Sequence, residues 1–247
     1  MKTRISPRRL GPALAVVLPL LFVSSTCRAD FLLPVNFEPG APVVLGNNGN
    51  LTYTFSSGAF HSSSTPITFG APFVTPRGFA TFSGSPRLTI DVIVNHNGDF
   101  VSNGTGLKLT GTVTINGATF TGDDTNPLLF GAITNFGADL AGPPTRTFDG
   151  YFTITGGALT QTQNGTGGTP VFGGFRAGES GAFILNAENV TGGTLGNFSQ
   201  NFASSSVKSS TGVLVPEPSG LALLLSGAVA LVWWGMGRAR CRVSPPG

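Results

Sequence analysis

Short runs of alternating apolar and polar residues fill the chain between Asp30 and Lys208, and Gly, Asn, Pro or Asp separate the runs. Alternation with a period of two is typical of strands that bury one face, and no useful length of the 3.6-residue helical period interrupts it. The pattern predicts an all-β fold. We expect an antiparallel β-sandwich, with a jelly-roll-like arrangement as one version of it.

The clearest hairpin is expected in LKLTGTVTINGATFTG, residues 107–122. Asn116-Gly117 suits a two-residue type I′ turn, because both turn positions need a positive φ. Such a turn would place Val113 opposite Phe120, so that the apolar face continues across the hairpin. Gly111 weakens the first strand and is a candidate bulge. The apolar face of the first strand comprises Leu107, Leu109, Val113 and Ile115.

A second strand is expected in RLTIDVIV, residues 87–94, and further strands at 51–55, 78–82, 151–155 and 181–186. The inward residues of the 87–94 strand would be Leu88, Ile90, Val92 and Val94. The Gly- and Thr-rich segment 162–170 predicts an exposed loop. We therefore expect one β domain at 30–198, followed by a Ser/Thr-rich spacer at 199–214.

The first 29 residues have a basic start, an apolar core from Leu10 to Val23 and a polar end with small residues. This order is typical of a secretory signal peptide. Cleavage between Ala29 and Asp30 is expected. The segment would carry the β domain across the inner membrane.

The last part of the chain, residues 215–242, joins a Pro-Glu-Pro triplet, an uncharged apolar run and an arginine cluster. Residues 220–237 predict a transmembrane helix, because together with Ser219 they give about 19 residues, which reach roughly 28 Å at 1.5 Å each, close to a hydrocarbon core. The cluster would stop transfer and leave residues 243–247 in the cytoplasm. It comprises Arg238, Arg240 and Arg242.

The triplet Pro216-Glu217-Pro218, the apolar helix and the arginine cluster, in this order, resemble the PEP-CTERM sorting signal of bacteria. The resemblance covers about the last 30 residues. It implies that an exosortase, a membrane protease, recognises the triplet and cuts the tail. The mature protein would then reach the envelope surface or the extracellular polymer. This sequence departs from the pattern in two ways, since Ala239 and Cys241 interrupt the arginines and VSPPG follows them.

Charge divides the chain into basic ends and an acidic middle. Between Asp30 and Pro218 there are six basic residues against all 11 acidic ones, a balance of −5. The two cysteines, Cys27 and Cys241, lie outside this middle segment. The β domain is thus not expected to bind nucleic acid, and it has no cysteine for a disulfide or a metal.

Candidate chemistry in the β domain is sparse. The two histidines, His61 and His96, are expected in exposed loops, and no nucleophile-elbow motif accompanies them. Asp123-Asp124, in the turn TGDDTNP, are the candidates for a calcium site, although turn formation alone accounts for them. No other cofactor or metal is expected.

The sequence therefore predicts a secreted, non-catalytic surface protein, a structural or adhesive component of the envelope or of an extracellular polysaccharide matrix. Its expected partners are the processing protease, the membrane before processing, and extracellular polysaccharide. Two alternatives stay open. One is a carbohydrate- or calcium-dependent binding module, and the other is a polysaccharide hydrolase, which would need two converging carboxylates.

Overall fold

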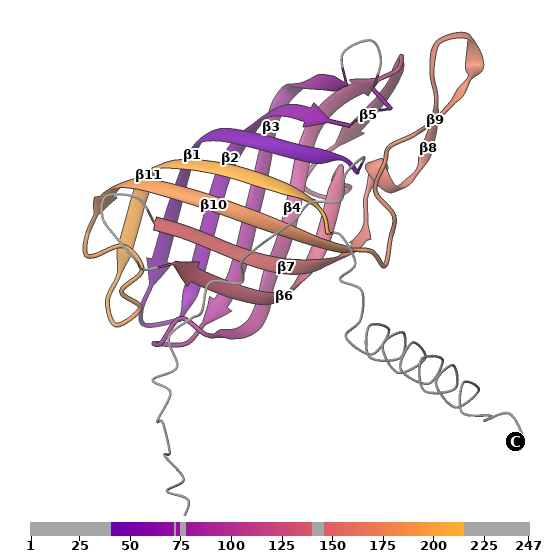
Figure 1. Cartoon of the computed structure of the whole chain (residues 1–247). Coiled ribbons are helices and arrows are strands. Elements are labelled where there is room, and N and C mark those ends of the chain that lie inside the picture. Colours follow the sequence, from indigo (N-terminus) through magenta and orange to yellow (C-terminus); the bar gives the residue numbers. More distant parts are fainter. Residues whose placement is uncertain (1–40, 72, 75–77, 140–145, 215–247) are drawn as a thin grey trace, which may run out of the picture.

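The computed structural model describes residues 41–71, 73–74, 78–139 and 146–214 (Figure 1). The predicted signal peptide with its cleavage site at Ala29 and Asp30 lies outside the described residues. So does the predicted tail with its triplet at Pro216 to Pro218 and its arginines. Among the described residues, no helix is long and apolar enough to cross a membrane.

The described chain is built almost wholly of strands, which confirms the all-β prediction. Two short 3₁₀ turns, η1 and η2, are the helical elements of this part of the chain. In chain order the elements are β1 (Val43–Thr54), β2 (Ala59–Gly70), β3 (Phe79–Val94), β4 (Phe100–Ile115), β5 (Ala118–Gly122), β6 (Leu129–Asp139), β7 (Arg146–Gly156), η1 (Ala158–Thr160), β8 (Thr162–Asn164), η2 (Thr166–Gly168), β9 (Pro170–Phe172), β10 (Ser180–Thr191) and β11 (Phe202–Val213).

The strands form one sheet that closes on itself (Figure 1). Its order is β3-β2-β1-β11-β10-β7-β6-β4, and β3 also pairs with β4, which completes a barrel of eight antiparallel strands. The predicted β-sandwich of two sheets is not confirmed. Alternation along a strand shows which face is buried but not which strands are neighbours, so a sandwich and a barrel have the same sequence pattern.

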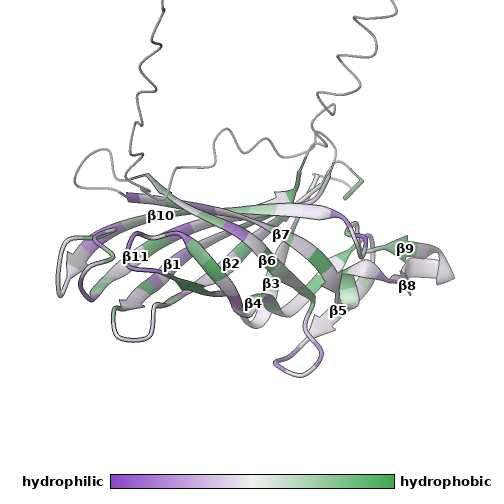
Figure 2. Cartoon of the chain, turned by 90° about the horizontal axis from the view of Figure 1, so that it is seen from below, coloured by the Kyte–Doolittle hydropathy of each residue, from purple (hydrophilic) through white to green (hydrophobic). Residues whose placement is uncertain are grey.

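The barrel interior is the hydrophobic core. Figure 2 shows hydrophobic and hydrophilic residues alternating along the strands, as expected when one face of each strand points inward. The predicted inward residues of β3 are buried, and so are those of β4. Nine phenylalanine and tyrosine side chains are among the largest fully buried groups, namely Tyr53, Phe60, Phe69, Phe120, Phe148, Phe152, Phe175, Phe183 and Phe202.

The predicted β4–β5 hairpin is confirmed to the residue. Asn116 and Gly117 both have positive φ, 48° and 80°, and Val113 pairs with Phe120. Gly111 also has a positive φ, and it faces the irregular segment of β3 between Ser83 and Arg87, where the β3–β4 register shifts. The predicted bulge therefore lies at this point of the ladder, with the extra residues on β3.

The predicted spacer at 199–214 is wrong for most of its length. Residues Phe202–Val213 form β11, which pairs with β1 on one side and β10 on the other. This strand looks like a polar linker because its inward positions include hydroxyl residues. Ser209 and Ser64 share a hydrogen bond of 2.7 Å, and Thr211 donates to the carbonyl of Ala182 at 2.9 Å.

A glycine of β1, Gly46, explains why a serine fits at the inward position 209 of β11. Gly46 lies against Ser209 and Ser64, and a side chain in its place would clash with both hydroxyls. Where β1, β2 and β11 lie side by side, the inward positions are therefore occupied by glycine and by hydroxyl side chains. The hydroxyls of Ser64 and Ser209 satisfy each other by hydrogen bonding inside the barrel. A prediction based on apolar alternation therefore misses β11 as a barrel strand.

Residues 162–170 were expected to be an exposed loop, but much of this segment is a hairpin. β8 and β9 pair as a separate two-stranded sheet beside the barrel, from Thr162–Phe172 to Asn164–Pro170. The β8–β9 hairpin extends from the rim at which β4 ends and β5 begins (Figure 1). Its position creates a pocket between the hairpin and this rim.

Candidate functional site

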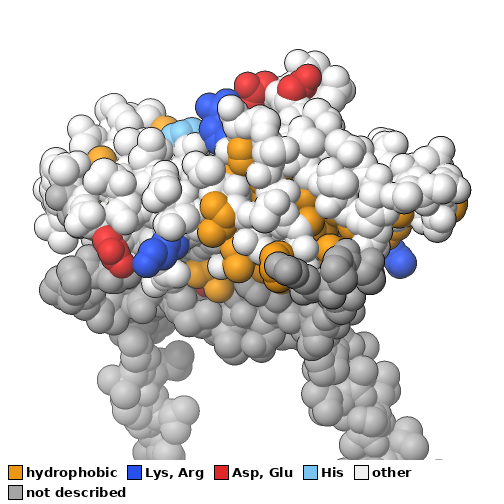
Figure 3. Space-filling view, turned by 90° about the horizontal axis from the view of Figure 1, so that it is seen from above, with side chains coloured by type: hydrophobic (Ala, Val, Ile, Leu, Met, Phe, Trp, Pro, Cys, Tyr) orange, Lys and Arg blue, Asp and Glu red, His pale blue; other side chains and the backbone are white. Residues whose placement is uncertain are grey.

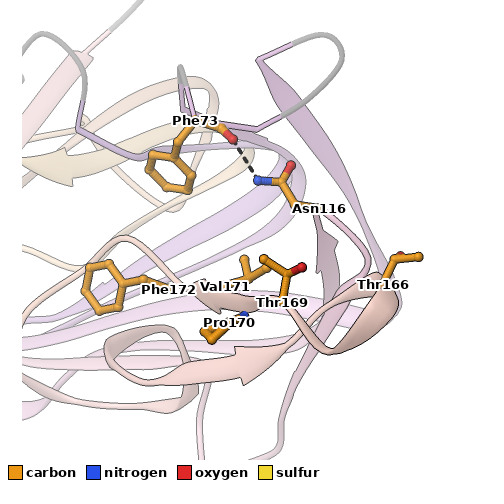
Figure 4. Close-up of a pocket in the computed structure, with 7 residues that line it drawn as sticks. All are labelled: Phe73, Asn116, Thr166, Thr169, Pro170, Val171 and Phe172. Atoms are coloured by element: carbon orange, nitrogen blue, oxygen red, sulfur yellow. Dashed lines mark hydrogen bonds between the residues drawn. The ribbon is translucent and has the colours of Figure 1, made fainter.

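A pocket of about 530 Å³ lies between the barrel rim and the β8–β9 hairpin (Figure 4). Phe73 and Asn116 lie on the rim side, and the β9 residues lie on the other side. Its volume is within the range of small-molecule sites. The described residues that line it are Phe73, Asn116, Thr166, Thr169, Pro170, Val171 and Phe172.

The β4–β5 turn fixes the rim side of the pocket. The type I′ conformation presents the Asn116 side chain, and its Nδ2 donates a hydrogen bond of 2.8 Å to the carbonyl of Phe73. This contact links the turn to the segment between β2 and β3. Phe73 also packs edge-on against the buried Phe69 ring, with centroids 6.4 Å apart. The Phe73 ring is therefore anchored, although 37% of the residue stays exposed.

Two glycines fix the hairpin against the rim. A Cβ on Gly117 would lie 2.8 Å from the backbone nitrogen of Thr166 and would clash with the Thr166 hydroxyl. A Cβ on Gly165 would lie 2.7 Å from the carbonyl oxygen of Asn116. The hairpin loop and the β4–β5 turn thus approach backbone to backbone, as only glycine allows.

The pocket combines apolar surface with neutral polar groups. The phenylalanine rings, Pro170 and Val171 provide the apolar surface, while Asn116 and the two threonines provide an amide and hydroxyls. No charged side chain is among the described lining residues. Outside the lining, the guanidinium carbon of Arg176 lies 5.8 Å from the centre of the Phe172 ring.

The histidine prediction is wrong for His61 and correct for His96. His61 lies on β2, directly opposite Asp91 on β3, and its Nδ1 is hydrogen-bonded to the Asp91 carboxylate. Thr105 donates its hydroxyl to the same carboxylate. In a catalytic triad the hydroxyl contacts the imidazole, and the imidazole contacts the carboxylate. Here the Thr105 hydroxyl contacts the carboxylate instead, so these three residues do not have the order of a triad. His96 lies in the turn after β3 and packs against the Phe55 ring at 4.3 Å.

The acidic pair Asp123-Asp124 is placed in the turn between β5 and β6, as predicted. Asp123 Oδ1 accepts hydrogen bonds from the backbone of Thr125 and Asn126 at 2.8 and 2.7 Å. These bonds hold the pKa of the Asp123 carboxyl below its usual range. The Asp123 side chain therefore closes its own turn.

Basic groups stand next to the other carboxylate of this turn. Asp124 lies 3.4 Å from the guanidinium of Arg87, and Lys108 donates to its backbone carbonyl at 3.2 Å. Figure 3 shows acidic side chains beside Lys and Arg on this face. Within the described residues, no three His, Cys, Asp or Glu side chains are grouped around a common point for a metal.

The sequence predicts the turn at Asn116-Gly117 and the exposed segment at 162–170, but not the pocket between them. Three lining residues, Phe73, Val171 and Phe172, lie outside both predicted segments. The contact between the two segments could not be predicted, because it depends on barrel closure. Comparison of the chain with protein-family models, curated proteins and solved structures finds no match.

Proposed function

We propose that this protein is an exported, non-catalytic component of the cell envelope or of the extracellular matrix, delivered by the N-terminal leader and sorted by the C-terminal tail. Its role would be structural or adhesive. One observation carries the proposal. The barrel is complete between Val43 and Leu214, so loss of either terminal segment breaks no described strand pairing.

The end of the barrel lies next to the proposed processing site. The backbone nitrogen of Leu214 donates a hydrogen bond of 3.0 Å to the carbonyl of Ser180, and Pro216 follows two residues later. The two prolines disfavour continuation of either the strand or a helix through the triplet. A cut within the triplet would therefore leave β11 and its partners in place.

The barrel also suits a durable extracellular role. Closure gives each of the eight barrel strands a partner on both sides, although β4 and β6 pair over three residues only, and this limits unwanted pairing with other chains. The folded part contains no cysteine, so its stability does not depend on the redox state of its compartment. The binding-module alternative is supported by the pocket. No specific observation on the described residues favours the calcium version or the hydrolase version.

The sorting proposal is tested by replacing Pro216, Glu217 and Pro218 with alanine in the full chain. We expect this variant to stay in the membrane fraction with its tail attached, while the wild type is released or transferred to the surface. A matched control replaces Pro245 and Pro246, which lie beyond the arginine cluster. Release of the triplet variant at the wild-type level would contradict the proposal.

A further inference from the structure

We propose that the pocket between the barrel rim and the β8–β9 hairpin binds a neutral sugar unit of a polysaccharide. This inference deepens the adhesive role proposed above, because it assigns that role a site and a ligand class. It rests on the lining chemistry and on the fixed relation of the two walls. It does not require the tail to be cut.

The lining matches the two-sided character of a sugar ring. A pyranose has C–H groups on its faces and hydroxyl groups around its edge. The Phe73 and Phe172 rings offer apolar surface for the C–H face, and Thr169 and Asn116 offer polar groups near the same space (Figure 4). Apolar walls with a few placed polar groups are the usual composition of ligand sites.

The charge of the site favours a neutral ligand over an acidic one. None of the described lining residues is charged, so a uronic acid or a phosphate would enter without a partner for its charge. Arg176 stands beside the Phe172 ring, outside the lining. A fully apolar ligand fits less well, since it would bury the Thr169 hydroxyl without offering it a hydrogen bond.

The two walls are held in a fixed relation before any ligand arrives. The Asn116–Phe73 hydrogen bond ties the turn to the β2–β3 connection, and the close approach of Gly117 to Thr166 ties it to the hairpin. Binding to a pre-formed pocket loses less conformational entropy, because its walls are already ordered. Displacing the hairpin by a single side chain at Gly117 should therefore weaken binding without touching the ligand.

The test is saturation-transfer NMR with the full chain, solubilised in a detergent that has no sugar headgroup. The probes are neutral hexasaccharides of glucose, galactose or mannose, with an oligogalacturonate as the acidic probe and a proline-rich peptide as the apolar one. We expect transfer to at least one neutral hexasaccharide. Phe73→Ala and Phe172→Ala should each weaken that binding about tenfold, the effect of losing one aromatic contact.

Two controls separate the pocket from general damage. Phe130→Ala removes another partly exposed phenylalanine, 39% exposed and outside the pocket, and should leave binding unchanged. Gly117→Ala and Gly167→Ala both place alanine at a positive φ, 80° and 73°, but only the first meets other atoms. Gly117→Ala should weaken binding, whereas Gly167→Ala should retain it.

The inference is overturned if folded protein gives no transfer to any neutral hexasaccharide. It is also overturned if the oligogalacturonate or the peptide binds in preference, or if Phe130→Ala weakens binding as much as the two pocket variants do. None of these results bears on sorting, which the triplet variant tests through membrane release. The sugar inference and the sorting proposal can therefore fail independently.

Discussion

Tyr53 connects β1 to the aromatic cluster at the end of the barrel opposite the pocket. Its ring stacks on Phe202 at 5.0 Å and meets Phe198 edge-on at 5.1 Å. Its hydroxyl donates to the carbonyl of Phe198 at 3.2 Å. Burial raises the pKa of the Tyr53 phenol above its usual value near 10, because a phenolate would lose its hydration.

This shift predicts a loss of stability at high pH. The folded state has the raised pKa, so the contribution of Tyr53 is complete below the unfolded value of about 10 and is lost as the pH rises toward the folded value. Tyr53→Phe should reduce this alkaline loss and cost about 1 kcal/mol at neutral pH through the missing hydrogen bond.

The measurement is urea unfolding at pH 7 and at pH 10.5, together with the phenolate absorbance of a Tyr151→Phe variant. That variant retains Tyr53 as its one tyrosine. We expect its absorbance to rise only above the titration range of free tyrosine. Titration of Tyr53 at the free value would show that the ring is not buried as described.

Asn103 extends the β4–β6 seam, the shortest strand pairing among the eight described barrel strands. β4 and β6 pair over three residues only, from Leu107–Gly131 to Leu109–Leu129. Beyond them the side-chain Oδ1 of Asn103 accepts a hydrogen bond of 3.0 Å from the backbone nitrogen of Ile133. An amide side chain therefore replaces a ladder bond where the two strands diverge.

Removing that side chain should open the seam. We expect Asn103→Ala to lower the free energy of unfolding by about 1 kcal/mol, the usual worth of one hydrogen bond. Asn103→Asp keeps an acceptor oxygen and serves as the control. Hydrogen exchange at the Ile133 amide should quicken in the alanine variant alone, and equal exchange in both variants would contradict this role.

At the scale of elements, alternation predicts the strands that have apolar inward residues and misses those that do not. The β4–β5 register follows from Asn116-Gly117, because a two-residue turn leaves no freedom in the pairing. β11 could not be predicted in the same way, since its inward hydroxyls fit only because Gly46 and Ser64 face them from neighbouring strands. The pocket depends on the same kind of long-range contact.

The role of β11 gives a prediction about truncation. A chain ending at Leu214 keeps every described strand and should unfold cooperatively in urea with an unchanged midpoint. A chain ending at Asn201 lacks β11 and leaves unpaired edges on β1 and β10. It should show no cooperative transition. Cooperative unfolding of the shorter chain at the same midpoint would restore the view that this segment is a spacer.

At the scale of the whole molecule, the chain has a barrel with few charges between two segments of different composition. The basic residues of those segments make the full sequence basic, with a net charge of +3, although the residues between Asp30 and Pro218 are acidic on balance. The barrel closes without either segment. The proposed export and sorting would therefore not compete with folding, and the working domain would be the part that remains after the proposed processing.

The most direct test of this account is the intact mass of the protein recovered from cells and medium, combined with sequencing of both termini. We predict a chain that begins near Asp30 and ends near Pro218. Such a chain would contain the whole barrel and lack Trp233, Trp234 and the arginine cluster. A recovered protein that retains the tail in most molecules would contradict the sorting proposal and identify the apolar segment as a permanent anchor.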